Sequence, residues 1–132
     1  SAGMREIINS DKKVIYCSEV GNSKYDLYKK AKALLFPIQW EEPFGLVMIE
    51  ALATGTPVLA YNFGSVPEII EEGRSGFIFD NDVIALANGI KLANIIDPSN
   101  CRKRAMDFSM EIMAKNYADF FEEIIEYLFN PF

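Results

Sequence analysis

The segment from Glu42 to Leu46 holds the residue types best suited to binding a ligand through charge and backbone amides. Pro43 forces Glu42 into an extended conformation and is well suited to the first position of a helix. The amides of Phe44, Gly45 and Leu46 would then lie in the first helical turn, free to hold phosphate or sugar oxygens. Because every α/β domain has such helix starts, a purely structural role is the simpler explanation of this turn taken alone.

Glu50 is a lone carboxylate in an otherwise apolar stretch from Phe44 to Ala53. A helix that is apolar all round is expected to be buried. Leaving a buried carboxylate unpaired costs on the order of several kcal/mol, so a partner must satisfy it. That partner is either a backbone amide or lysine of this domain, or a pair of ligand hydroxyls such as those of a ribose. The position of Glu50 favours the ligand.

Two further segments have polar groups that structure alone can explain. Ser65 and Glu68 match a capping box at the start of a helix. The amides of Gly64 and Ser65 offer a second cradle for an anion. Arg74 could reach a phosphate, although a solvated arginine in a turn is the simpler expectation.

The composition excludes several classes of protein. The 132 residues carry 13 Lys and Arg against 19 Asp and Glu, a net charge of −6, which argues against a nucleic-acid partner. The sequence has no histidine, and Cys17 and Cys101 lie far apart, so no zinc site or His-activated nucleophile is expected. Two cysteines expected to be buried as free thiols, no apolar segment long enough to span a membrane and no signal peptide predict a cytoplasmic protein. We also expect that it binds no metal.

The order of elements predicts a single α/β domain over residues 1–132. Four short apolar segments alternate with helical ones, which is typical of a parallel sheet covered on both faces. The expected strands are 14–18, 34–36, 57–60 and 76–79, and the expected helices between and after them are 24–32, 44–53, 65–72 and 82–95. We therefore predict a Rossmann-like three-layer domain with about four strands and additional C-terminal helices.

The C-terminal third is helical in pattern, with expected helices over 99–115 and 117–129. Phe120, Phe121, Tyr127 and Phe129 belong either to the core or to a surface for a neighbouring molecule. The second alternative would allow a homo-oligomer to form through these helices.

These motifs together resemble family 4 of the retaining, nucleotide-sugar-dependent glycosyltransferases. The likeness rests on the run Glu-Pro-Phe-Gly-Leu-Val-Met-Ile-Glu from Glu42 to Glu50, the Ala-Leu-Ala-Thr-Gly-Thr-Pro-Val that follows it, and the segments 64–68 and 73–76. Two glutamates separated by seven residues are the signature of that family. The resemblance implies the GT-B fold, in which two Rossmann-like domains face each other across a cleft.

The resemblance also implies roles for named residues. Glu50 would bind the ribose hydroxyls of the donor nucleotide, and Glu42 would lie beside the donor sugar and take part in catalysis. The amides of Phe44, Gly45 and Leu46 would contact the sugar hydroxyls and the distal phosphate, and the loop containing Val20 would flank the base. The donor would be a UDP-, GDP- or ADP-hexose, glucosyl- or mannosyl-like, and no metal or other cofactor would be needed.

The sequence departs from the family pattern at its beginning. The family's Arg/Lys pair, which balances the diphosphate charge, lies upstream of the first residue, as does the N-terminal Rossmann-like domain that binds the acceptor. We therefore expect part of a C-terminal donor-binding half that is inactive alone and, through the other half, could associate peripherally with a membrane. The alternatives are a non-catalytic GT-B-derived assembly module, or another GT-B enzyme such as a sugar-nucleotide epimerase or a phosphorylase.

Overall fold

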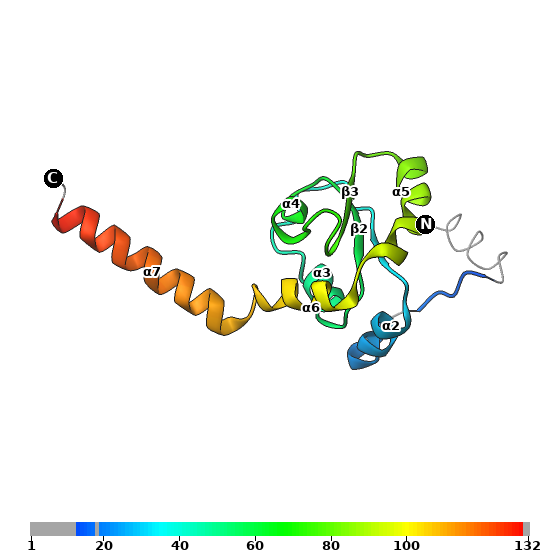
Figure 1. Ribbon diagram of the computed structural model, residues 1–132, viewed down its shortest axis with the longest axis horizontal. Helices are drawn as coiled ribbons and strands as arrows, with labels where there is room; N and C mark the ends of the chain where they lie inside the picture. Colours follow the sequence, from blue (N-terminus) through cyan, green and yellow to red (C-terminus); the bar gives the residue numbers. More distant parts are fainter. Residues whose placement is uncertain (1–12, 18, 131–132) are drawn as a thin grey trace.

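A three-stranded parallel sheet forms the centre of the molecule. The computed structural model describes residues 13–17 and 19–130 (Figure 1). Strands β1 (Leu34–Phe36), β2 (Val58–Tyr61) and β3 (Gly76–Phe79) lie in the order β1-β2-β3. Leu34 pairs with Val58, and Val58 pairs in turn with Gly76. The predicted α/β class and the parallel sheet are confirmed.

Helices cover both faces of this sheet and bury opposite sides of the central strand. Val58 and Ala60 of β2 face one core, together with residues of α3, α4 and α6. Leu59 and Tyr61 face a second core with Leu86 of α5. All four residues of β2 are buried, as expected for a strand with a neighbour on each side and a helix layer above and below. The three-layer arrangement is therefore confirmed.

The helices differ from the expected ones mainly at their ends. They are α2 (Lys24–Lys30), α3 (Leu46–Ala53), α4 (Val66–Ile69), α5 (Val83–Gly89), α6 (Pro98–Met106) and α7 (Met110–Phe129), with 3₁₀ turns η1 (Gly21–Ser23) and η2 (Ile90–Ile95). Helix α3 ends at Ala53 as predicted, and Gly55 follows it: the Gly55 amide bonds the Leu52 carbonyl at 2.9 Å, and the Thr56 amide bonds the Ala51 carbonyl at 3.0 Å. The break before α7 lies at 107–109 rather than near residue 116, because Ser109 caps the last helix through the Ile112 amide.

The first predicted strand is absent from the described structure. Residues 14–17 form no strand, and Ile15 and Tyr16 are 83% and 71% exposed. Ser18 lies outside the described residues. A strand needs a hydrogen-bonding neighbour, and no described residue pairs with this segment, so the sheet has three strands rather than four.

The last helix, α7, extends away from the body of the molecule (Figure 1). None of its residues is buried, and Phe120, Phe121, Tyr127 and Phe129 are all more than half exposed. Assigning these aromatic residues to the core is therefore wrong, and they form an exposed apolar surface instead. Among the described residues, no helix combines the length and apolar character needed to cross a membrane.

The two cysteines lie in different environments. Cys101 is buried in the core, and burial raises the pKa of its thiol to about 11. Cys17 is exposed, so the prediction of two buried thiols is wrong for one of them. Both are free thiols, which agrees with the wide separation of the two residues in the sequence.

Candidate active site

Most of the predicted site residues gather where the chain leaves the carboxyl end of β1. A pocket of about 220 Å³ is lined by Phe36, Trp40, Glu42, Phe44, Gly45, Leu46 and Val47. Four of the six predicted residues therefore share one pocket. In an open parallel sheet this edge is where ligands ordinarily bind.

The turn into α3 begins later than the sequence predicts. Gly45 precedes the first helical residue, Leu46, and has a left-handed conformation with φ of 61°. Pro43 is therefore not the first helical residue, and the prediction that Phe44 and Gly45 lie inside the first turn is wrong. The left-handed residue turns the chain into the helix and favours glycine, because a Cβ there would be 2.2 Å from Met48 Cε.

The amides of this turn are nevertheless open. Met48 is the first residue of α3 whose amide bonds back, to the Gly45 carbonyl at 2.9 Å. Within the part of the chain that the structure describes, the amides of Phe44, Gly45 and Leu46 have no hydrogen-bond acceptor. An anion at this helix start would meet several N–H donors together with the positive end of the helix dipole.

Glu50 is held by one ion pair through one oxygen, and its other oxygen is unbonded within the described residues. Lys24, at the start of α2, donates to Glu50 Oε1 at 2.9 Å, and the Glu50 side chain is 24% exposed. The hydrogen bond to Glu50 raises the pKa of Lys24. Glu50 Oε2 is buried and has no partner in the described structure. One oxygen thus has the lysine that the sequence left as an alternative, and the other still lacks a donor.

The helix that carries Glu50 is not buried all round. Met48, Ala51 and Leu52 are fully buried, but Leu46 and Phe44 are each 60% exposed and Val47 is 39% exposed. The premise that an all-apolar helix must be enclosed by this chain is therefore wrong here. The exposed apolar side chains instead form the wall of the pocket beside Glu42.

Glu42 lies at the pocket wall and contacts a residue that the sequence did not single out. The Trp40 indole donates to Glu42 Oε2 at 3.3 Å, and Trp40 is 62% exposed. Lys24 is likewise a functional candidate, because it holds Glu50 Oε1. The only sequence signal for these two residues is their position in the loop after β1 and at the start of α2.

The second predicted anion cradle is filled by the chain itself. The Gly64 amide donates to Glu41 Oε2 at 2.6 Å, and the Ser65 amide donates to the Glu42 carbonyl at 2.8 Å. The predicted cradle at these amides is therefore wrong. The two bonds instead fix the loop that carries Glu42 against the loop that follows β2.

The predicted capping box at the start of α4 is also wrong. The Ser65 hydroxyl makes no cap bond, although the residue is only 7% exposed, and its oxygen has no partner in the described structure. The Ser65 amide bonds Glu42 rather than Glu68, so neither half of the box forms. Ser65 Oγ lies within 3.0 Å of the position that a Cβ on Gly45 would take, close to the turn into α3.

Val20, like Glu50, does not line the pocket. It precedes η1, and its carbonyl accepts hydrogen bonds from the hydroxyl and the amide of Ser23. The Ser23 side chain makes no cap bond to α2. Lys24 follows directly, so the Val20 loop is connected to Glu50 through the lysine.

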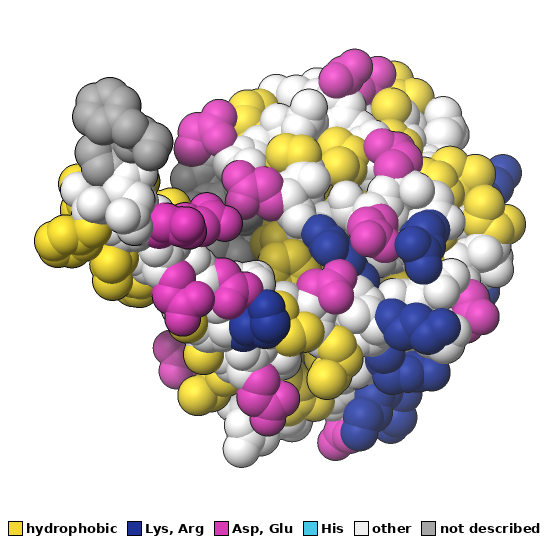
Figure 2. Space-filling model, turned by 60° about the vertical axis from the view of Figure 1, so that its left-hand side comes forward, with side chains coloured by type: hydrophobic (Ala, Val, Ile, Leu, Met, Phe, Trp, Pro, Cys, Tyr) yellow, Lys and Arg dark blue, Asp and Glu magenta, His cyan; other side chains and the backbone are white. Residues whose placement is uncertain are grey.

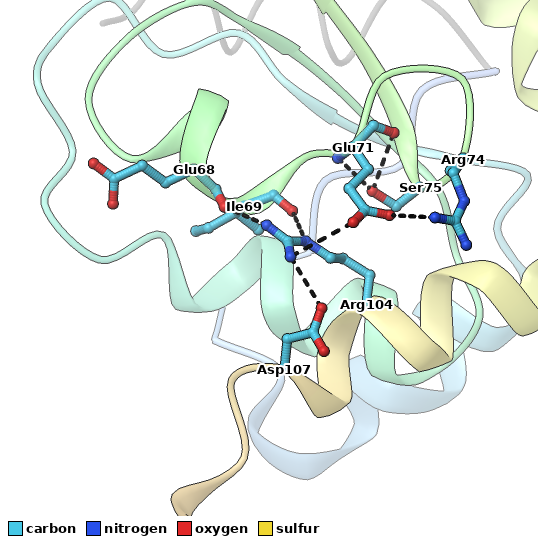
Figure 3. A network of polar contacts seen from close by, with 7 residues as sticks. All are labelled: Glu68, Ile69, Glu71, Arg74, Ser75, Arg104 and Asp107. Atoms are coloured by element: carbon cyan, nitrogen blue, oxygen red, sulfur yellow. Dashed lines mark hydrogen bonds and ion pairs between the residues drawn. The ribbon is translucent and has the colours of Figure 1, made fainter. Parts of the chain in front are cut away.

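A second polar cluster lies between α4 and α6, and Figure 3 shows its bonds. We call it the Arg104 cluster; it comprises Glu68, Ile69, Glu71, Arg74, Ser75, Arg104 and Asp107. Arg104 Nε donates to the Ile69 carbonyl at 2.8 Å, and Arg104 Nη1 donates to Asp107 Oδ2 at 3.0 Å. Arg104 Nη2 donates to the Glu68 carbonyl. Arg74 is exposed and pairs with Glu71 at 3.6 Å, as expected for a solvated arginine.

A metal has no evident place in the described structure. No group of three or more His, Cys, Asp or Glu side chains in residues 13–17 and 19–130 is arranged to hold a metal ion. Metal-independent function stays a prediction.

Comparison with known proteins identifies the family. Residues 5–106 match the family described as glycosyl transferases group 1. The chain belongs to this glycosyltransferase family. A spore coat protein SA of Bacillus subtilis is 30% identical over 91 residues, which cover 69% of this glycosyltransferase chain and 24% of that protein. A D-inositol 3-phosphate glycosyltransferase of Streptomyces scabiei is 47% identical over 53 residues, covering 40% of the chain and 12% of that enzyme.

A solved structure supports the same assignment. Sucrose-phosphate synthase from Thermosynechococcus elongatus superimposes with a TM-score of 0.73 at 28% identity, covering 94% of this chain and 33% of that one. The resemblance to a GT-B glycosyltransferase and the Rossmann-like fold are thus confirmed. This glycosyltransferase chain spans a quarter or less of the curated relatives described above.

Proposed function

We propose that this chain is the donor-binding part of a retaining family 4 glycosyltransferase, which transfers a hexose from a nucleoside diphosphate sugar. The observation that carries the proposal is the buried Oε2 of Glu50, which has no hydrogen-bond donor among the described residues. Within those residues, the amides at the start of the same helix also have no acceptor. A buried carboxylate oxygen without a donor is costly, and a ribose hydroxyl would supply that donor.

In this proposal each group of the site has a separate task. Lys24 holds Oε1 of Glu50, so that Oε2 accepts a ribose hydroxyl. The amides of Phe44, Gly45 and Leu46 bind the distal phosphate and the sugar hydroxyls, where the helix dipole favours negative charge. Glu42, held beside the pocket by the Trp40 indole, faces the sugar.

The remaining part of the reaction belongs to residues outside this site. Among the described residues, no lysine or arginine lines the pocket at Glu42, so the charge of a leaving diphosphate needs cations from elsewhere. We place those cations on a further segment of the donor-binding domain, and the acceptor site on a second Rossmann-like domain facing the pocket. The exposed side chains of Phe44, Leu46 and Val47 are suited to a wall of such a cleft.

Calorimetric titration with UDP, GDP, ADP and their glucose and mannose conjugates tests this proposal. We expect saturable binding of one nucleotide, and roughly a tenfold loss of affinity in Glu50→Gln, which keeps the size of the side chain but weakens the acceptor. Glu123→Gln, on the exposed helix α7, is the matched control and should bind as the unchanged chain does. Absence of binding to the folded chain, or equal weakening by both variants, would contradict the proposed donor site.

The exposed helix α7 supports a second candidate function, a non-catalytic assembly module. An apolar surface of this length is typical of an interface, and a second copy could cover it. This alternative predicts tight self-association without nucleotide binding. Sedimentation velocity on the same samples separates the two, since the donor-binding proposal requires nucleotide binding whatever the oligomeric state.

A further inference from the structure

We propose that a basic pocket at the amino ends of the strands binds a small phosphate-bearing anion with at least two negative charges. This basic pocket has a volume of about 600 Å³, and its walls include Lys29, Lys32, Thr54, Gly55, Asn94 and Arg102. It is independent of the proposed donor site and of the reaction proposed above.

The basic pocket lies at the opposite end of the sheet from Glu42. Lys32 precedes β1, and Pro57, which also lines the pocket, immediately precedes β2. Glu42 and Gly45 follow β1 instead. The strands are parallel, so segments before and after them lie at opposite edges. A ligand in the basic pocket is therefore separated from the donor site by the length of the strands.

Three cations face this pocket without a carboxylate partner. Within the described part of the chain, Lys29, Lys32 and Arg102 make no salt bridge, whereas Lys24, Arg74 and Lys115 each make one and Arg104 makes two. The whole chain has a net charge of −6, so a concave group of three positive charges is a local reversal of its sign. In Figure 2 several basic side chains gather at the lower right of the view, whereas acidic ones are spread over the surface. A hollow lined by one sign of charge concentrates ions of the other sign.

The Arg102 guanidinium is positioned by the backbone of Gly55, against which it lies. A Cβ at Gly55 would be 2.3 Å from Arg102 Nη1 and 3.1 Å from Pro98 Cβ, so the guanidinium lies directly against the glycine. Asp97, the N-cap of α6, interacts electrostatically with Arg102 but makes no ion pair with it, and its carboxylate accepts from the Ser99 amide at 2.8 Å. Arg102 therefore presents an unpaired planar donor at a defined place, which suits the geometry of a phosphate.

Neutral donors complete the pocket. The Asn94 side chain lines it and has no hydrogen-bond partner within the described structure. Two lysines, one arginine and one amide can together supply donors to several oxygens of a compact anion. Pyrophosphate satisfies this arrangement better than inorganic phosphate, because its charge is larger and its oxygens span a greater distance.

Titration with pyrophosphate, followed by the amide resonances of the ¹⁵N-labelled chain, tests the proposal. We expect saturable shifts at Gly55 and Asn94, an affinity that falls with added salt, and weaker binding of inorganic phosphate. Arg102→Gln should weaken binding roughly tenfold, as expected for loss of a charge-assisted donor. Lys103→Gln, which removes the same charge from the same helix outside the pocket, should leave the affinity unchanged.

Three results would overturn the proposal. They are the absence of saturable shifts, shifts confined to Gly45 and Gly64 at the other end of the sheet, and equal weakening by Arg102→Gln and Lys103→Gln. A second arm identifies the source of the phosphate, using co-sedimentation with phosphatidylcholine vesicles doped with phosphatidic acid. Vesicle binding that depends on Arg102 would assign the pocket to lipid headgroups. If the chain binds pyrophosphate but not the vesicles, the pocket is assigned to free anions.

Discussion

The Arg104 cluster and the Glu50 site are both ionic, yet they differ in how completely their polar groups are bonded. Arg104 donates to two backbone carbonyls and pairs with Asp107 and Glu71, so it connects α6 to the end of α4. Glu50 has one partner on one oxygen and none in the described structure on the other. A fully bonded cluster is explained by the fold that it stabilises, whereas an incompletely bonded one calls for a ligand or a further part of the protein.

The largest effect is expected from removing the centre of the bonded cluster. Arg104→Met should lower the free energy of unfolding by about 3 kcal/mol, because two carbonyls and two carboxylates lose a charged donor that is only 18% exposed. Urea unfolding followed by circular dichroism measures this. Arg74→Met is the matched control, since its single ion pair is exposed and contributes about 0.5 kcal/mol or less. Equal losses in both variants would show that the cluster is not a stabilising unit.

A smaller effect is expected in the turn that supports the open site. Gly45→Ala should cost about 2 kcal/mol, because an alanine is strained at a φ of 61° and its Cβ would overlap Met48. Gly73→Ala is the control, since that residue also has positive φ but has nothing within 4 Å of the added Cβ. The difference between the two unfolding free energies isolates the overlap. No difference would mean that the turn readily moves, and the case for preformed amides would fail.

Lys24→Met should affect ligand binding more than stability. The methionine leaves Glu50 without its single partner, so the carboxylate is no longer held with Oε2 open. If Glu50 binds the ribose, nucleotide affinity should fall roughly threefold, the size of effect expected for a partly exposed ion pair. The control is Lys30→Met on the same helix, and both variants are compared by calorimetry and by Tm. A large fall in Tm without any change in affinity would make Lys24 a structural residue only.

The difference between the two clusters also explains what could be predicted from the sequence. Periodicity and turn residues predict the strands at 34–36 and 76–79 and the end of α3 at Ala53, because these features depend on local geometry and burial. The spacing of Glu42 and Glu50 likewise predicts which turn forms the pocket. The bonds of Arg104, in contrast, join residues 35 positions apart, and no local pattern specifies them.

The wrong predictions have a common physical cause. The apolar run at 14–17, the exposed side of α3 and the aromatic residues of α7 all have the composition of buried elements, but the described chain provides nothing to cover them. Sequence patterns indicate that a surface is suited to burial, and they do not indicate which molecule buries it. The same limit applies to Lys24, whose partner could not be read from its own helix.

The smallest effect is expected at Asp97, an exposed carboxylate that is bonded but not buried. The Ser99 amide is the main reason that its pKa is lowered below the ordinary value of 3.8, and Lys103 and Arg102 contribute further. A carboxyl with a lowered pKa in the folded state stabilises the protein above its unfolded pKa, and this contribution is lost as pH falls through the folded value. Asn also caps helices, so Asp97→Asn should be slightly less stable than the unchanged chain above pH 3.8, and the difference should shrink in more acid solution. Unfolding midpoints of both chains across this pH range measure it. A difference that does not depend on pH would mean that the shape of the cap, rather than its charge, stabilises the start of α6.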